Sequence, residues 1–303
     1  MMRRLAVALA ALAMLAGCSS RPDYVPRYFS PIGEGELVLI PLDPPDRDIQ
    51  LVARICRPDD AARAPVVVIA HGAPSDPARI GEMQPTGCDS EPARWFNDRG
   101  YIVVFALRRG FGGSTGPMVE STGRCDRPSY FRPALAAARD IDATVKYATA
   151  LPYAQPTGAI VIGQSTGGWA TIAYDSVPHP QVAALISMAG GTGGHAYGEP
   201  GQICDPEAFL AATKRFGQIS ISPMLWVYAQ NDSFFPPDWV RQMASIYQRT
   251  GSKLIVAQVP PYGQDGHGLF YAPGGSQVWG PIIQNYLAVL PSLERRRPGY
   301  PPS

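Results

Sequence analysis

Residues 159–169 read AIVIGQSTGGW, and this stretch decides the fold. Its first four residues form a short, continuous apolar run, which is typical of a strand covered on both faces of a sheet. The pattern G-x-S-x-G follows directly in residues 163–167, and a helical segment follows from Trp169. A strand, a sharp turn and a helix in this order hold a nucleophilic serine on strained backbone. We therefore predict that Ser165 is a nucleophile; the alternative is a glycine-rich turn without a chemical role.

The chain on both sides of this stretch alternates between short apolar runs and segments with helical spacing. Such alternation predicts an α/β fold, with a mostly parallel central sheet and helices on both faces. Two β-rich segments separated by a cluster of Pro and Asp come first and predict an N-terminal β-hairpin. The predicted strands are 36–42, 49–57, 66–70, 101–106, 159–162, 182–188, 224–228 and 254–257, and the predicted helices are 91–98, 132–150, 169–175, 206–216, 238–249 and 277–290.

A serine hydroxyl is a weak nucleophile, so it needs a base, and the base needs a group that orients it. Among the four histidines, His267 lies between the last predicted strand and the last predicted helix. Asp232 follows the predicted strand that ends at residue 228 and is the candidate acid. Asp265 is a rival, but it lies two residues from His267 and is expected to cap the loop. The chain order Ser165, Asp232, His267 differs from the orders of chymotrypsin and subtilisin.

Acyl transfer also needs backbone donors for the oxyanion of the tetrahedral intermediate. The amide of Thr166, the residue after the nucleophile, is one candidate. The second candidate is the amide of Ala73, in the loop His71-Gly72-Ala73-Pro74 that follows the strand 66–70. In this interpretation His71 shapes the loop and is not a base, and Gly72 lets the backbone approach the substrate.

From about Val66 to Leu290, these motifs resemble the α/β-hydrolase superfamily, and especially its dienelactone-hydrolase-like branch. The loop 108–114, RRGFGGS, is similar to the R-G-x-G-x-S loop of epoxide hydrolases and proline iminopeptidases. It departs from them at Leu107 and Arg108, where those relatives usually have an aspartate two places before the arginine. It also departs from dienelactone hydrolase itself, whose nucleophile is a cysteine. The resemblance therefore implies the fold and the reaction class but not the substrate.

These motifs favour a serine hydrolase that cleaves a small-molecule ester without a metal or organic cofactor. A serine peptidase of the same fold is the second hypothesis, and an envelope lipoprotein that binds a ligand without turnover is the third. The formal net charge of +1 argues against nucleic acid as a partner. Loop aromatic residues could line a substrate pocket or simply pack within the loops; they are Phe111, Tyr197, Phe234, Phe235 and Trp239.

The N-terminus has the layout of a signal peptide, with Arg3 and Arg4 followed by an apolar run from residue 5 to 16. Residues 15–18, LAGC, resemble the lipobox of bacterial lipoproteins, whose cysteine is lipidated; an ordinary signal peptide is the alternative. We therefore expect a signal peptide over 1–18 with lipidation at Cys18, a tether over 19–35, one catalytic domain over 36–291 and a tail rich in Pro and Arg over 292–303. The expected location is the cell envelope, on the outer membrane in a Gram-negative host; otherwise the protein is secreted or periplasmic.

Four further cysteines remain after Cys18, an even number that suits an oxidising compartment. Four cysteines allow three pairings, and four unpaired cysteines are the alternative. We favour Cys88 with Cys125, because both are expected in loops at the carboxyl edge of the sheet, and Cys56 with Cys204 by exclusion.

Overall fold

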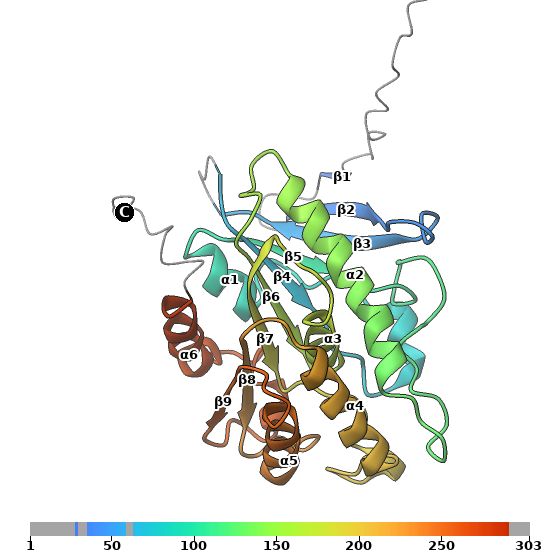
Figure 1. Cartoon of the computed structure of the whole chain (residues 1–303). Coiled ribbons are helices and arrows are strands. Elements are labelled where there is room, and N and C mark those ends of the chain that lie inside the picture. The colour runs from blue at the N-terminus through green and yellow to red at the C-terminus, as the bar shows by residue number, and fades with distance from the viewer. Residues whose placement is uncertain (1–27, 30–34, 59–62, 291–303) are drawn as a thin grey trace, which may run out of the picture.

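The computed structural model describes residues 28–29, 35–58 and 63–290, and these form one sheet flanked by helices (Figure 1). Nine strands in the described chain follow the order β1-β2-β3-β5-β4-β6-β7-β8-β9. The predicted signal peptide with Cys18, nearly all of the predicted tether and the predicted tail lie outside the described residues. None of the helices within the described ranges is long and apolar enough to cross a membrane.

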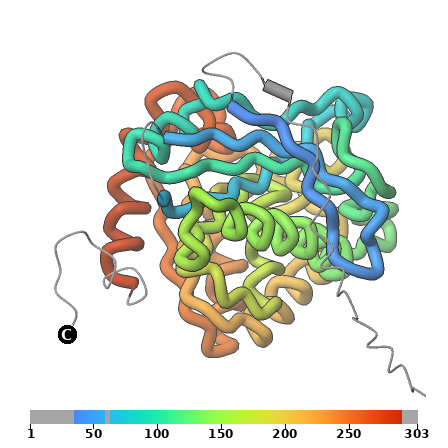
Figure 2. Tube along the Cα trace, turned by 90° about the horizontal axis from the view of Figure 1, so that it is seen from above, coloured from blue at the N-terminus to red at the C-terminus, as the bar shows by residue number. Residues whose placement is uncertain are grey.

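The N-terminal hairpin is confirmed as β2 (Glu36–Pro41) paired antiparallel with β3 (Gln50–Cys56). A two-residue strand, β1 (Tyr28–Phe29), extends its outer edge. On its inner side β3 pairs antiparallel with β5 (Ile102–Ala106), and Figure 2 shows the hairpin in blue alongside this part of the sheet. The hairpin therefore joins the main sheet as an antiparallel edge.

The rest of the sheet is parallel. From β5 the order continues through β4 (Val66–Ala70), β6 (Ala159–Gln164), β7 (Val182–Met188), β8 (Met224–Ala229) and β9 (Leu254–Val259). Every residue of β4, β5, β6 and β8 is buried, as their continuous apolar sequences predict.

Helices cover both faces of the sheet (Figure 1). On one face α1 (Glu91–Asn97) and α6 (Ser276–Ala288) pack against alternate strand residues such as Val67 and Ile69. On the other face the intervening residues pack against α2 (Phe131–Ala150), α3 (Thr166–Tyr174), α4 (Pro206–Ile219) and α5 (Pro237–Gln248). The predicted helices are thus present within a few residues of their expected bounds, and three short 3₁₀ helices that were not predicted are η1 (Pro77–Glu82), η2 (Ala196–Gly198) and η3 (Gly266–Gly268).

Strand β4 marks the point where the winding of the sheet reverses. The chain passes from β4 to β5 on one side, and then returns through α2 to β6 on the other side of β4. Connections that leave in opposite directions open a crevice at the carboxyl ends of the two strands. The residues that follow β4 and β6 therefore lie where a ligand is expected in an open α/β sheet.

The predicted disulfide pairing is wrong. The bonds are Cys56–Cys88 and Cys125–Cys204, with Cα atoms 5.4 and 4.9 Å apart. Cys56 ends β3 opposite Val103 at the amino end of β5, because β3 and β5 are antiparallel. The long segment after β4 brings Cys88 back to that end of the sheet before α1 begins, rather than leaving it at the carboxyl edge. Cys125, in the β5–α2 loop, instead meets the segment that precedes α4.

Candidate active site

Ser165 lies on the sharp turn between β6 and α3. Its backbone has φ +56° and ψ −122°, a strained conformation for a residue with a side chain. A Cβ at Gly163 would overlap the Gly167 carbonyl, and one at Gly167 would overlap the carbonyl of Ala70 in β4. The glycines of the G-x-S-x-G pattern therefore allow the turn to close tightly against the neighbouring strand.

The backbone around Ser165 is held from β7. The Ser165 amide donates to the Met188 carbonyl at 3.0 Å, and the Gly191 amide donates to the Ser165 carbonyl at 3.1 Å. These bonds hold both sides of the turn, and they stabilise the strained backbone conformation of Ser165.

His267 reaches Ser165 from η3, between β9 and α6. Its Nε2 lies 3.0 Å from Ser165 Oγ. The side-chain amide of Gln164 donates to the His267 carbonyl at 3.1 Å and so ties the histidine loop to the serine turn. Phe234 stacks on the imidazole, with ring centroids 4.0 Å apart. Stacking on Phe234 thus fixes the orientation of the His267 ring, and its Nε2 stays within hydrogen-bonding distance of the Ser165 hydroxyl.

Asp232 completes the chain of contacts on the other side of the imidazole. Its oxygens Oδ1 and Oδ2 lie 3.0 and 3.1 Å from His267 Nδ1, and its side chain is fully buried. Oδ1 also accepts from the amides of Phe234 and Phe235 at 2.9 and 3.0 Å. A carboxylate at Nδ1 fixes the tautomer with the proton on Nδ1, which leaves Nε2 free to accept a proton from Ser165.

Asp265 has a different role in the same loops. It accepts from the amides of His267 and Ser233, each at 3.0 Å, and from the Ser233 hydroxyl at 2.6 Å. Burial alone would raise the pKa of Asp265, but the hydrogen bonds from Ser233 and from the His267 amide lower it overall. Asp265 therefore caps η3, as expected from its position, and holds the loop that carries His267.

The segments that carry the two predicted oxyanion donors both lie against Ser165. Thr166 is the first residue of α3, so its amide belongs to the helix turn whose N–H groups have no intrahelical acceptor. On the β4 side, a Cβ at Gly72 would lie 3.0 Å from the Ser165 Cβ and 2.5 Å from Gln164 Oε1. Only glycine lets this loop approach so closely, and Ala73 follows it directly.

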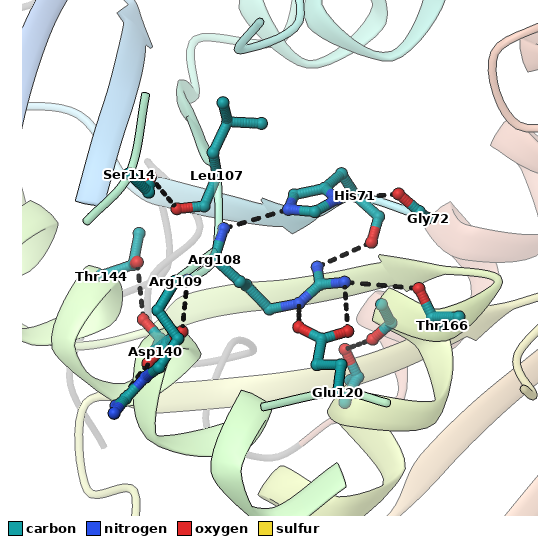
Figure 3. A network of polar contacts seen from close by, with 12 residues as sticks. His71, Gly72, Leu107, Arg108, Arg109, Ser114, Glu120, Asp140, Thr144 and Thr166 are labelled. Carbon is teal, nitrogen blue, oxygen red and sulfur yellow. Dashed lines mark hydrogen bonds and ion pairs between the residues drawn. The ribbon is translucent and has the colours of Figure 1, made fainter. Parts of the chain in front are cut away.

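His71 does not face the nucleophile. Its Nε2 accepts from the Arg108 amide at 3.0 Å, and its Nδ1 donates to the Gly72 carbonyl at 2.8 Å (Figure 3). Burial, together with the Arg108 charge, lowers the pKa of His71 well below its ordinary value. A neutral, hydrogen-bonded imidazole fits the predicted loop-shaping role.

The other two histidines do not contact Ser165 in the described structure. His179 lies away from the triad and bonds Ser222 at 2.9 Å, while exposed His195 stacks on Phe234 with ring centroids 3.9 Å apart.

Of the loop aromatic residues, Phe234 contacts the base. Phe111 is buried against His71, Phe235 is fully buried, and Trp239 packs on Phe209. Tyr197 is 84% exposed.

Sequence reasoning missed three features that support the site. Gln164 bonds the His267 loop, Asn231 accepts from the Tyr262 amide at 2.8 Å, and Arg108 pairs with Glu120. Gln164 and Asn231 each lie beside a predicted catalytic residue, and this adjacency was the available signal. The Arg108–Glu120 pair gave none, because both residues lie in a loop without periodicity.

Within the described ranges, no group of three or more His, Cys, Asp or Glu side chains could hold a metal ion. The donor set at Ser165 is one hydroxyl, one imidazole and one carboxylate already bonded to one another. This arrangement suits proton transfer and nucleophilic attack by the serine.

Several solved structures share this architecture. Est1E from Butyrivibrio proteoclasticus, solved with ferulic acid bound, matches with a TM-score of 0.54 and 18% identity over 82% of this chain and 98% of its own. A putative dienelactone hydrolase from Klebsiella pneumoniae gives 0.54 and 15%, over 84% and 97%. The acylaminoacyl peptidase of Pyrococcus horikoshii gives 0.61 and 16%, over 88% of this chain but 42% of the peptidase. No curated protein sequence matches the chain.

The sheet order and these neighbours show that the chain has the α/β-hydrolase fold, which confirms the predicted fold class. Residues 46–254 match the family described as X-Pro dipeptidyl-peptidase (S15 family), and the chain belongs to that family. It is therefore a hydrolase of the serine type, within a family that was not predicted from the sequence.

Proposed function

We propose that the chain hydrolyses a carboxylic ester through an acyl-enzyme on Ser165. The observation that carries this proposal is the continuous chain of contacts from Ser165 Oγ through His267 to Asp232, with successive distances of 3.0 and 3.0 Å. Nucleophile, base and orienting acid are then within hydrogen-bonding distance before any substrate binds.

In the first half of the reaction, Ser165 Oγ attacks the substrate carbonyl carbon while His267 Nε2 takes the hydroxyl proton. The amides of Ala73 and Thr166 stabilise the negative charge that develops on the carbonyl oxygen. Collapse of this intermediate breaks the ester bond, and His267 gives the proton to the leaving alcohol. Asp232 stabilises the imidazolium formed in between. Water then attacks the acyl-enzyme by the same steps, which releases the acid and restores Ser165.

Two features favour an ester over a peptide. Between β7 and β8 the described chain carries only η2 and α4, so no large lid selects an extended substrate there. The site's carboxylates are also engaged: Asp232 by His267, Asp265 by Ser233, and Glu120 by Arg108. Carboxylates engaged in this way have fewer free lone pairs to offer the N-terminal ammonium of a peptide substrate.

A peptidase that releases X-Pro dipeptides from the N-terminus of a peptide is the second candidate, and the family match favours it. The two are separated by two sets of chromogenic substrates: p-nitrophenyl esters of increasing acyl length, which release p-nitrophenol, and Ala-Pro-p-nitroanilide with and without a blocked amine, which releases p-nitroaniline. Ethyl esters followed by acid release add substrates without an activated leaving group.

We expect turnover of short esters and little cleavage of the anilides. Ser165→Ala should lose all activity, and prolonged EDTA treatment should leave the activity of the wild-type protein unchanged. Faster cleavage of unblocked Ala-Pro-p-nitroanilide than of every ester would instead assign the peptidase activity. Equal turnover by Ser165→Ala would overturn both candidates, and a wild-type protein inactive on all substrates would favour the ligand-binding lipoprotein.

We also propose that lipidation at Cys18 attaches the protein to the cell envelope. This rests on the apolar run and the LAGC box of the sequence. An acylated N-terminal cysteine carries enough acyl chains for stable attachment, whereas one chain gives only marginal binding.

A further inference from the structure

Arg108 is a buried arginine directly after β5, next to the candidate active site but in contact with neither Ser165 nor His267 in the contacts described above. Its guanidinium pairs with Glu120 through two hydrogen bonds, of which Nη2 to Oε2 measures 2.9 Å. Both side chains are at least nine-tenths buried. A buried ion pair of this kind is weak evidence for stability in itself, because desolvation offsets the attraction. Its other contacts therefore need an explanation.

These other contacts go to the two segments that carry the oxyanion donors (Figure 3). Nη1 donates to the His71 carbonyl at 2.7 Å, and Nη2 lies 3.4 Å from Thr166 Oγ1. The Arg108 amide donates to His71 Nε2 at 3.0 Å. One residue thus holds the backbone and the ring of His71, two residues before Ala73, and also touches Thr166.

The surroundings make this arrangement rigid. Phe111 packs edge-on against the His71 ring, with centroids 4.7 Å apart, and lies 5.4 Å from the guanidinium carbon of Arg108. The Nδ1–H of His71 is bonded to the Gly72 carbonyl at 2.8 Å, so the turn leading to Ala73 has few alternatives. Glu120 fixes the guanidinium in turn, and it lies five residues before Cys125, which is bridged to Cys204.

We propose that Arg108, oriented by Glu120, is a positioning residue that sets the separation of the Ala73 and Thr166 amides in the oxyanion hole. This inference rests on the proposed function, because it assumes that these amides bind the oxyanion. Since Glu120 neutralises the guanidinium, the role depends on geometry and not on net charge. A lysine keeps the charge but cannot bond Glu120 twice while also reaching the His71 carbonyl.

The test uses Arg108→Lys, Arg108→Met and the double variant Arg108→Met with Glu120→Gln. The double variant removes both buried charges, so it separates the cost of an unpaired ion from the loss of the contacts to His71. Arg109→Lys is the matched control: Arg109 is also buried and ion-paired, but with Asp140 and Asp46.

The readouts are kcat and KM for the best ester, the affinity for a trifluoromethyl ketone that forms a tetrahedral adduct, and thermal unfolding. A misplacement of about 1 Å at a reacting centre can cost about 100-fold in rate. We therefore expect kcat to fall by about 10- to 100-fold in all three Arg108 variants, with KM changed less than about threefold. Affinity for the ketone should fall in parallel with kcat, and Arg109→Lys should keep both values per folded molecule.

A folded double variant with wild-type kcat and ketone affinity would overturn the proposal and leave the pair a purely structural role. If that variant does not fold, Arg108→Lys decides the question by the same two readouts. Failure of the underlying function is distinguished by Ser165→Ala: if that variant still hydrolyses the ester, the mechanism itself is wrong, whatever Arg108 does.

Discussion

Replacing Asp232 with asparagine should disable the site while leaving its shape intact. Asparagine has the same size, and its carbonyl oxygen can still accept from the amides of Phe234 and Phe235, which bond Asp232 Oδ1 at 2.9 and 3.0 Å. The side-chain NH₂ then takes the place of Oδ2, 3.1 Å from His267 Nδ1. Oδ1 also lies 3.0 Å from Nδ1, but it already accepts from two amides, so the NH₂ group facing Nδ1 favours the tautomer with the proton on Nε2.

The magnitude follows from this change of tautomer. A proton on Nε2 points at Ser165 Oγ, 3.0 Å away, and the imidazole can no longer accept the serine proton. In serine proteases, the equivalent error of tautomer lowers kcat by about 10⁴-fold. We expect a loss of about 10³- to 10⁴-fold, which corresponds to roughly 4 to 5.5 kcal/mol of transition-state stabilisation. The melting temperature should change little, because both backbone bonds to the side chain remain.

The assay is steady-state hydrolysis of the best p-nitrophenyl ester, with the fold checked by circular dichroism. Asp265→Asn is the control, since Asp265 bonds the same loops without touching the imidazole nitrogens. We expect it to lower kcat by less than about tenfold. Near-wild-type activity in Asp232→Asn together with a large loss in Asp265→Asn would show that Asp232 is the wrong carboxylate.

Three further predictions concern stability and location. Replacing Cys125 and Cys204 with serine opens a loop with a sequence separation of 79 and should lower the free energy of unfolding, measured in urea, by about 4.5 kcal/mol. Replacing Cys56 and Cys88, whose separation is 32, should lower it by about 3.7 kcal/mol. A smaller effect for the longer loop would contradict the explanation by loop entropy. The folded state lowers the pKa of Asp265, so its stabilising contribution is present at neutral pH and lost as the pH falls below about 4. The difference in unfolding free energy between wild type and Asp265→Asn should therefore shrink in acid, and a constant difference would argue against this. Cys18→Ser should release the protein from bacterial membranes or leave an unprocessed precursor, whereas an unchanged membrane fraction would argue against the lipid anchor.

The sequence predicted the architecture because the inner strands β4, β5, β6 and β8 are buried on both faces. Continuous apolar runs such as 66–70 and 159–162 are therefore visible between amphipathic helices. The meeting of Ser165, Asp232 and His267 could be predicted for a related reason. The carboxyl ends of parallel strands share one edge of the sheet, so residues that follow different strands converge there. Their catalytic roles stay predictions.

The disulfides and the Arg108 contacts could not be predicted, because they depend on the paths of long loops. The same edge argument placed Cys88 beside Cys125, but the segment after β4 returns to the opposite edge before α1. Glu120 lies twelve residues from Arg108 in a loop with no regular structure, and sequence spacing does not show that such a loop folds back. Local sequence patterns therefore predicted the helices and strands, but not the paths of the long loops that connect them.

The most direct test of the account is the site of covalent labelling by a fluorophosphonate. The reagent reacts with a serine activated by its base, so it reports the nucleophile whatever the natural substrate is. Tandem mass spectrometry of the labelled, digested protein should place a single adduct on Ser165, and Ser165→Ala should take up none. An adduct on another residue, or equal labelling of Ser165→Ala, would contradict the assignment of the nucleophile.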